Sequence, residues 1–251
     1  VSDFSPNAGP DDALAMISAH VPSELRSALE DVIDLCSEAG ALERALGRLA
    51  RSGPPHYDLP RPRNTADAIL QGEQVAAQER QRLGLGPGSP VNSVADVVAS
   101  QGIRVAVLQL PEEVTGIYLR HPLVGSLAIS GTDQDRVSRW GLLHQYAFAL
   151  FETGRSLVVS TPINANELIH IRASAFAAAF LLPQAGIESA IEGLDKGRPS
   201  RRALAVFGYA IEDLVEAEVR SAPGSQTLSC HDVATIAARF GASYESAGYR
   251  L

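Results

Sequence analysis

The stretch "GLLHQYAFALFE", residues Gly141–Glu152, has the length and apolar spacing of a buried helix, yet a histidine and a glutamine stand in its middle. Together with the residues just before it, the stretch forms an i, i+3, i+4 stripe made of Val137, Trp140, His144, Phe148 and Phe151. The stripe is apolar except for His144. We therefore predict a helix over 133–153 whose buried face carries one imidazole.

A second apolar helix is predicted from Glu167 to Leu182, directly before Pro183. Its stripe consists of Ile169, Arg172, Phe176 and Phe180. Arg172 is the only charge in that stripe, and a buried guanidinium needs an acidic or hydrogen-bonding partner. The two stripes predict two helices packed together in the core.

The segments before this helix pair differ in periodicity. Helices are predicted over 66–83 and 93–100, and short strands in "GIRVAVLQL", "GIYLR" and "GSLAIS". Because helices and strands come in runs and do not alternate, the order predicts an α+β core with a small three-stranded sheet, not a βαβ sheet. The predicted core domain covers residues 66–190.

Two helical regions flank the predicted core. Residues 1–52 contain one or two amphipathic helices, expected to serve packing or homodimer formation, and the four prolines within 53–65 predict a linker. Residues 191–251 read as helical throughout: a helix and a loop over 198–225, then two short helices around Gly241 whose spacing resembles a helix-turn-helix.

Composition excludes several classes of protein. The formal net charge of −8 argues against a surface built for phosphate backbones, because nucleic-acid affinity depends on clustered Lys and Arg. The two cysteines are far apart and suggest no disulfide framework. The sequence contains no run of about 18 apolar residues, which a membrane span would need. We expect a cytoplasmic protein without a membrane partner, and the first residue, Val1, suggests a processed or trimmed start.

Several segments agree, in order and spacing, with one known family. These are "VNSVADVVASQGIRVAVLQLPEEVTGIYLR", "SLAIS", "DRVSRWGLLHQYAFALF", "RASAFAAAFLLP" and "DVATIAARFGASYESAGYRL". Over roughly residues 66–251 the chain resembles the ImmA/IrrE zinc peptidases, in the subfamily of bacterial regulators where an Xre-type DNA-binding domain precedes the peptidase. The resemblance implies a zincin-like core with a helical segment before it and a helix-turn-helix-like region after it.

The resemblance also implies where catalytic residues would stand. Family members carry two zinc histidines and a glutamate base as H-E-x-x-H on one helix, and a third ligand, a glutamate, on the next. Carried over, the first histidine is His144, the base position holds Gln145, the second histidine position holds Phe148, and the third ligand falls on or near Arg172. Glutamine cannot act as a base, phenylalanine has no lone pair and arginine repels a dication. We therefore predict no catalytic residue, no metal and no cofactor.

Three interpretations of this site stay open. His144 is a hydrogen-bonded core histidine, or His144, Gln145, Phe148 and Arg172 line a remnant cleft that binds a protein or a small anionic ligand. The third interpretation is a zinc site with substitute ligands, such as Glu167 or His170 beside His144. Three functions also stay open: an inactive domain that binds a protein or small ligand as the sensory or interaction part of a transcriptional regulator, a metallopeptidase that cleaves a repressor, and a purely structural, antitoxin-like interaction module.

The C-terminal helix pair also allows two interpretations. DNA contact would use Arg239, Tyr244 and Arg250. Intramolecular packing of the pair is the alternative, and the few basic residues nearby favour it. DNA thus remains a candidate partner, through this region or through a preceding domain.

Overall fold

The computed structural model describes residues 14–15, 17–47, 53–122, 124–133, 136–152, 154–194, 204–206, 214–216 and 227–251. The described helices are η1 (Ser23–Leu25), α2 (Arg26–Ala45), α3 (Thr65–Arg82), α4 (Val94–Ser100), α5 (Arg139–Phe151), α6 (Leu168–Leu181), α7 (Gln184–Gly193), α8 (Cys230–Phe240) and α9 (Tyr244–Arg250). The described strands are β1 (Ile103–Val107), β2 (Gly116–His121), β3 (Gly125–Ser130), β4 (Thr132–Asp133), β5 (Arg136–Val137), β6 (Leu157–Ser160), β7 (Leu204–Val206) and β8 (Leu214–Glu216). The predicted α+β class is confirmed.

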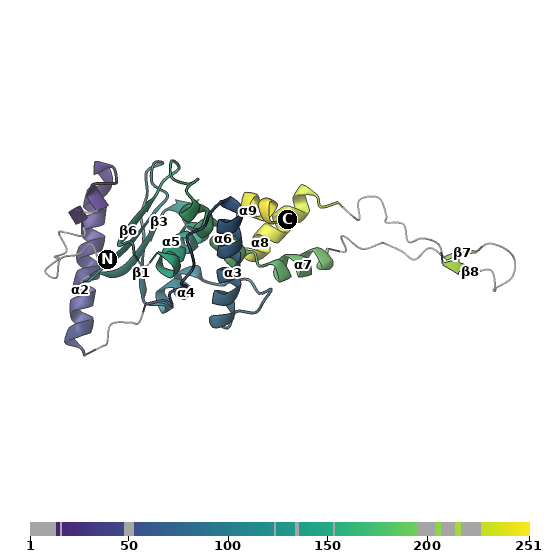
Figure 1. The fold of residues 1–251 in the computed structure, drawn as a ribbon, viewed down its shortest axis with the longest axis horizontal. Helices are drawn as coiled ribbons and strands as arrows, with labels where there is room; N and C mark the ends of the chain where they lie inside the picture. Colours follow the sequence, from purple (N-terminus) through teal and green to yellow (C-terminus); the bar gives the residue numbers. More distant parts are fainter. Residues whose placement is uncertain are drawn as a thin grey trace. The chain divides into compact units, whose positions relative to one another are not determined.

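The chain divides into two compact units. The first combines Val1–Leu83 with Val91–Phe180, and the second combines Gly84–Pro90 with Leu181–Leu251. The sheet, α2, α3 and α5 all belong to the first unit (Figure 1). The helices α7, α8 and α9 belong to the second.

The main sheet has four strands, in the order β1-β3-β2-β6, so the prediction of three strands is wrong by one. β2 runs antiparallel to both β3 and β6, whereas β1 runs parallel to β3. The missed strand, β6, lies in the stretch that we expected to be a loop. It is a four-residue edge strand, paired through contacts such as Ile117 with Val159, and such non-local pairing leaves no local periodicity to detect.

The helix α5 begins later than the predicted 133–153. Ser138 is its N-cap, because the Ser138 side chain accepts a hydrogen bond of 3.1 Å from the Gly141 N–H. The residues predicted as the first turn instead form the two-stranded ladder of β4 and β5. Thr132, Asp133 and Ser138 are all residue types that cap helices, so the sequence contains two plausible starts.

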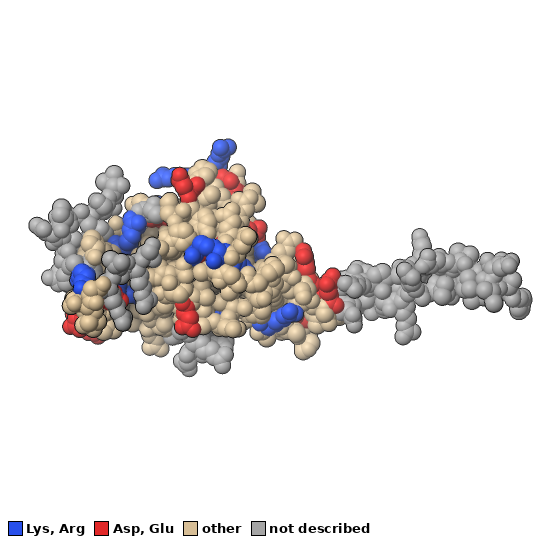
Figure 2. All heavy atoms as spheres, turned by 90° about the horizontal axis from the view of Figure 1, so that it is seen from below, with Lys and Arg blue, Asp and Glu red and all other residues tan. Residues whose placement is uncertain are grey.

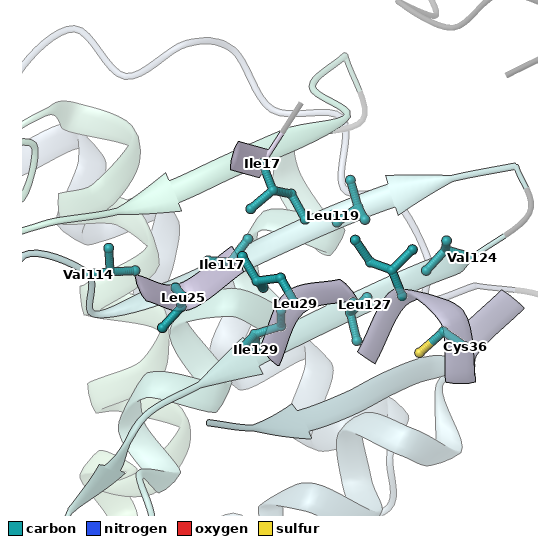
Figure 3. Packing of buried hydrophobic residues seen from close by; sticks show 11 residues of the cluster. Ile17, Leu25, Leu29, Cys36, Val114, Ile117, Leu119, Val124, Leu127 and Ile129 are labelled. Carbon is teal, nitrogen blue, oxygen red and sulfur yellow. The ribbon is translucent and has the colours of Figure 1, made fainter. Parts of the chain in front are cut away.

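One face of the sheet is covered by α2. Leu29, Ile33 and Cys36 of this helix pack on side chains that point to the same side of β2 and β3 (Figure 3). The strand residues in this cluster are Ile117, Leu119, Leu127 and Ile129. They alternate with residues that face the other way, as the two-residue period of a strand requires.

The opposite face of the sheet is covered by α5, which contacts both β2 and β3 (Figure 1). Every residue of α5 from Gly141 to Phe151 is buried. Gly116 of β2 permits this approach, because a Cβ at this position would collide with the side chain of Gln145. The middle of α5 is thus held directly against the central strand.

The Pro-rich segment predicted as a linker lies against the C-terminal end of α5. The Tyr57 N–H donates to the Leu150 carbonyl at 3.0 Å, and His56 Nδ1 lies 3.0 Å from the same oxygen. The Gln71 side chain of α3 donates to the Pro60 carbonyl at 3.2 Å. The contacts of Tyr57 and His56 satisfy the Leu150 carbonyl, which the end of α5 leaves without an intrahelical partner.

The second unit contains the predicted helix pair at the C-terminus. Ser229 and Asp232 form a capping box at the start of α8, and Gly241 ends α8 with φ at 60° before α9 begins. The helix predicted within 198–225 is corrected in part: 204–206 and 214–216 form the antiparallel strands β7 and β8, and its other residues lie outside the described ones. Helical spacing of apolar residues there misled the prediction.

The surface of the described residues carries both signs of charge. On the face drawn in Figure 2, acidic and basic side chains are interspersed among wide uncharged areas. Within the described ranges, no single helix is long and apolar enough to cross a membrane. The pair α6 and α7 passes that test only jointly, across a bend of 43°.

Candidate functional site

The middle of α5 buries two polar side chains, His144 and Gln145, with exposures of 4% and 1%. The Ser138 cap fixes the start of the helix, and the apolar residues around the two side chains draw the helix onto the sheet. Burying a polar side chain costs free energy, so such a side chain is expected to have hydrogen-bond partners or a functional role. Their surroundings therefore define the candidate site.

His144 belongs to a cluster of four rings, here called the ring cluster: Trp140, His144 and Phe148 of α5, and His170 of α6. The His144 ring stacks on Trp140 with centroids 4.9 Å apart and meets the edge of Phe148 at 5.1 Å. His170 completes the cluster, 5.6 Å from His144 and 5.2 Å from Phe148. The sequence pointed to three of these four residues as one face of a helix.

Both imidazoles of the ring cluster are neutral at pH 7. Burial, with a smaller contribution from the neighbouring His170, lowers the pKa of His144 to about 3. Burial also lowers the pKa of His170, although Glu167 opposes that shift. Protonation of either ring would place a charge among aromatic side chains.

Gln145 fixes the tautomer of His144. Its amide donates to His144 Nδ1 at 3.3 Å and to Ser160 Oγ of β6 at 3.2 Å. Since Nδ1 accepts this bond, the imidazole proton lies on Nε2. The Gln145 carbonyl oxygen is buried and has no hydrogen-bond partner among the described residues.

Arg172 does not join the other predicted site residues. Its guanidinium donates to Gln71 of α3 at 3.0 Å and to the Glu152 carboxylate at the end of α5, and it lies 4.7 Å over the Phe151 ring. His170 is the α6 residue that meets His144. Two residues along a helix turn by about 200°, so His170 and Arg172 point to opposite sides of α6.

The third ligand position was expected on or near Arg172, and the α6 residue that lies beside His144 is His170, two positions earlier. The expectation that a buried Arg172 has a partner is confirmed. The partner is Glu152, with 16% of its side chain exposed against 4% for Arg172. The sequence could not choose between His170 and Arg172, because the choice depends on which side of α6 faces α5.

The residues present do not fit the zinc site that the family resemblance implies. Within the described part of the chain, no group of three or more His, Cys, Asp or Glu side chains could hold a metal ion. His144 and His170 are two imidazoles, Phe148 fills the place of a third donor, and Glu167 is exposed. A catalytic zinc site needs three protein ligands and an open position.

A buried carboxylate that the sequence did not reveal lies on α3. Glu79 is fully buried and accepts hydrogen bonds from Tyr57 at 2.8 Å, from Tyr146 of α5 and from Arg82 at 2.8 Å. Burial alone would raise the pKa of Glu79, but these donors hold it below its usual range. Burial, and after it the hydrogen bond to Glu79, raises the pKa of Tyr57 to about 12.

The residues considered for DNA contact lie on α8 and α9. Arg239 stands in the last turn of α8 with its guanidinium 5.7 Å from the Phe240 ring centre. Tyr244 begins α9 with 48% exposure, and Arg250 is in the last turn of that helix. The three residues lie on adjacent helices, and α9 has seven residues.

The fold and the site define a mixed α+β domain whose central helix buries a histidine against a small sheet. Residues 98–251 match the family described as the IrrE N-terminal-like domain, and the chain belongs to this family. The match runs from the end of α4 to the C-terminus and confirms the ImmA/IrrE resemblance at family level. A search of curated proteins found no match.

Proposed function

We propose that this chain carries a catalytically inactive IrrE-like domain that serves as the sensory or interaction part of a bacterial transcriptional regulator of the Xre-type subfamily. The observation that carries the proposal is Phe148. Its ring packs against both imidazoles at 5.1 and 5.2 Å, in the place where the family has its second zinc histidine. A carbon ring offers no lone pair to a metal.

The other replacements support the same proposal. Gln145, at the position of the catalytic glutamate, donates through its amide nitrogen to His144 and Ser160. A neutral amide is not basic enough to take a proton from water. Arg172 is engaged by Glu152 and Gln71. Each polar side chain that replaces a catalytic group is thus built into the packing of the core.

A protein is a better candidate ligand than a small anion. An anionic ligand in the remnant cleft would be recognised by Arg172, two of whose three nitrogens already bond to Gln71 and Glu152 while the third, Nε, is buried. His144 and His170 are neutral and cannot replace that charge. We therefore propose that the regulator responds to a partner protein and relays its binding to DNA-contacting elements.

DNA contact is proposed only for a part of the regulator other than the ring cluster. The pair α8 and α9, with Arg239, Tyr244 and Arg250, is one candidate, and an Xre-type domain preceding this chain is the other. The net charge of −8 favours the second, because non-specific DNA affinity needs clustered basic residues.

The test is metal content and hydrolysis in protein purified without chelator. We expect zinc far below one ion per chain and no cleavage of a general peptidase substrate. The matched variants are His144→Ala in the ring cluster and His231→Ala on the exposed start of α8. Stoichiometric zinc that disappears in the first variant and persists in the second would overturn the proposal.

The same experiment tests the rival function, an active metallopeptidase with substitute ligands. The observation in its favour is the proximity of His144 and His170, whose centroids are 5.6 Å apart. If these imidazoles held zinc with a carboxylate such as Glu167, His170→Ala would remove the metal as fully as His144→Ala. An antitoxin-like module would instead show neither zinc nor any effect on DNA binding by the complete regulator.

A further inference from the structure

The Pro-rich segment over residues 53–60, here called the strap, precedes α3 and lies outside residues 98–251, which match the family. Three of its eight residues are proline and lack an N–H, so the strap is held by contacts with other parts of the chain. The Tyr57 N–H donates to the Leu150 carbonyl at the end of α5 at 3.0 Å. The Tyr57 hydroxyl donates to Glu79 of α3 at 2.8 Å.

Glu79 binds the strap and α5 with one carboxylate. Its Oε2 accepts from the Tyr57 hydroxyl and from Arg82 Nε, each at 2.8 Å. Its Oε1 accepts from the Tyr146 hydroxyl and from Arg82 Nη2. Tyr146 lies on α5 directly after Gln145. Each oxygen therefore has one arginine donor and one tyrosine donor, and the two tyrosines come from the strap and from the helix of the ring cluster.

The groups to which the strap is bonded keep other partners when the strap detaches. Glu79 is fully buried, but Arg82 still donates to both of its oxygens. The Leu150 carbonyl lies in the last turn of α5, where water can replace the lost donor. Gln71, which donates to a strap carbonyl at 3.2 Å, keeps its bond with Arg172. The strap can therefore detach while the core stays folded.

The two tyrosines that share Glu79 differ in burial. Tyr57 is partly buried, and its neighbours His56 and Asp58 are exposed. Tyr146 is fully buried within α5 and cannot leave Glu79 unless the core opens. The carboxylate thus has one donor that can leave and one that is fixed.

We propose that the strap is a detachable regulatory contact and that Glu79 couples its detachment to α5. Each donor on a carboxylate offsets part of its negative charge, so the donors weaken one another. When Tyr57 leaves, Glu79 therefore holds Tyr146 and α5 more tightly, and loss of the Tyr146 bond makes the strap bind more tightly in return. This coupling is independent of what the ring cluster binds, so it goes beyond the proposed function.

Residue-resolved amide hydrogen exchange of the full chain measures detachment, because the Tyr57 N–H is bonded to the Leu150 carbonyl. We expect a protection factor for this amide on the order of a hundredfold lower than those of the central strand β2, whose amides exchange through larger openings. A value equal to those of β2 would mean that the strap opens only when the core unfolds. That result would overturn the proposal, as would the absence of any protection.

Tyr57→Phe tests the bond to Glu79, because it removes the hydroxyl and keeps the ring and the backbone N–H. Loss of a hydrogen bond to a charged group should lower the protection factor of residue 57 at least about tenfold. The Arg63 amide, which donates to Asp67 of α3, is the internal control and should not change. Tyr249→Phe, at a side chain 93% exposed on α9, is the matched control variant. Unchanged protection of residue 57 in Tyr57→Phe would overturn the role of Glu79.

Tyr146→Phe tests the coupling, because sharing of Glu79 and simple packing predict opposite signs. Without the Tyr146 hydroxyl, the carboxylate should hold Tyr57 more tightly and raise the protection factor of residue 57 at least about twofold. General loosening of α5 would lower it. Lower or unchanged protection therefore overturns the coupling.

Arg82→Lys keeps the coupling testable if Tyr146→Phe fails to fold. The Arg82 side chain is 37% exposed, and lysine keeps the charge but has one nitrogen in place of the two that bond to Glu79. Protection of residue 57 should rise in this variant too. A fall would mean that the donors on Glu79 support one another, and detachment of the strap would then loosen α5, contrary to the proposal.

Discussion

The two faces of the main sheet are built by different means. On the α2 side, aliphatic side chains and Cys36 fill the interface, and none of the clustered residues carries a charge. On the α5 side, the helix brings His144 and Gln145 under cover and ends near an Arg172–Glu152 ion pair. Packing on the α2 face is stabilised by filling volume with apolar side chains. Packing on the α5 face also depends on the hydrogen bonds and the ion pair of its polar groups.

This difference shows what a buried polar site requires of the residues around it. A buried polar group cannot simply be surrounded by apolar side chains, because it still needs a hydrogen bond. The Gln145 amide nitrogen meets that need by donating to His144 and Ser160, whereas the Gln145 carbonyl oxygen has no partner among the described residues. Substitutions on the two faces should therefore differ in size and in their dependence on pH.

The largest expected effect is removal of Glu152. Glu152→Ala leaves the Arg172 guanidinium buried without its acidic partner, which costs about 3–5 kcal/mol in the free energy of unfolding. Chemical denaturation of the variant and wild type measures the difference. Loss below about 1 kcal/mol would mean that Gln71 and solvent satisfy Arg172 without the carboxylate.

A double variant separates charge from packing in this prediction. Arg172→Met combined with Glu152→Gln removes both charges and keeps most of the volume, so it should be much less destabilised than Glu152→Ala alone. Equal destabilisation of the two variants would show that packing, and not the charge pair, stabilises this position, as on the α2 side. The contrast between the two faces would then be weaker.

The second prediction uses the spacing of the ring cluster. In a tetrahedral zinc site with Zn–N bonds of about 2.0–2.1 Å, the centres of two imidazole ligands lie on the order of 5 Å apart. The His144, Phe148 and His170 rings are separated by 5.1, 5.2 and 5.6 Å. Phe148→His should thus create a three-imidazole site.

Zinc at about 100 times its dissociation constant should then stabilise Phe148→His by about 2.7 kcal/mol, measured as a zinc-dependent rise in Tm. Wild type should show no such rise, and adding His170→Ala to the variant should abolish it. Retention of the zinc effect with His170→Ala would mean that His170 does not face the site, and a stronger zinc effect in Phe148→His with Arg172→Ala would mean that the Arg172 guanidinium stands near it.

The third prediction concerns pH and the α5 face. Burial keeps His144 neutral by lowering its pKa to about 3, whereas the same group in the unfolded chain titrates near 6.5. Between these values the unfolded chain binds more protons, so stability falls as pH falls from about 6.5 towards 3. His144 alone should remove about 2 kcal/mol between pH 7.5 and pH 5.

His144→Gln tests this assignment because it is neutral at every pH. Its stability should depend less steeply on pH than that of wild type over the same interval, measured by denaturant unfolding at each pH. An unchanged slope would assign the acid sensitivity to other groups, such as His170, whose pKa is also lowered by burial.

Local patterns predicted the helices better than they predicted the site. The stripes on α5 and α6, the cap-like residues and the αL Gly241 are encoded within a few residues of each helix, and these elements are confirmed. The strand β6 was missed because only its partner β2 defines it. The same holds for β4 and β5, which displaced the first predicted turn of α5.

The site depends on contacts between residues far apart in the chain, and these carry little sequence signal. Tyr57 and Tyr146 meet Glu79 across 22 and 67 residues, so nothing near Glu79 marked it as buried except its position three residues before Arg82. His170 was considered only as a substitute ligand. Whether it or Arg172 faces α5 follows from the packing of α6 against α3, where Gly72 lets the α6 backbone approach closely.

The smallest expected effect belongs to the α2 face. Ile33→Val removes one buried methylene from an apolar cluster and should cost about 0.5–1.5 kcal/mol at every pH, because no titratable group changes its surroundings. Leu42→Ala, on the exposed side of α2, should leave the stability of the protein nearly unchanged, since Leu42 is 60% exposed. Denaturant unfolding at low protein concentration measures both. A cost for Leu42→Ala as large as that for Ile33→Val would mean that Leu42 is covered within one chain, as Ile33 is.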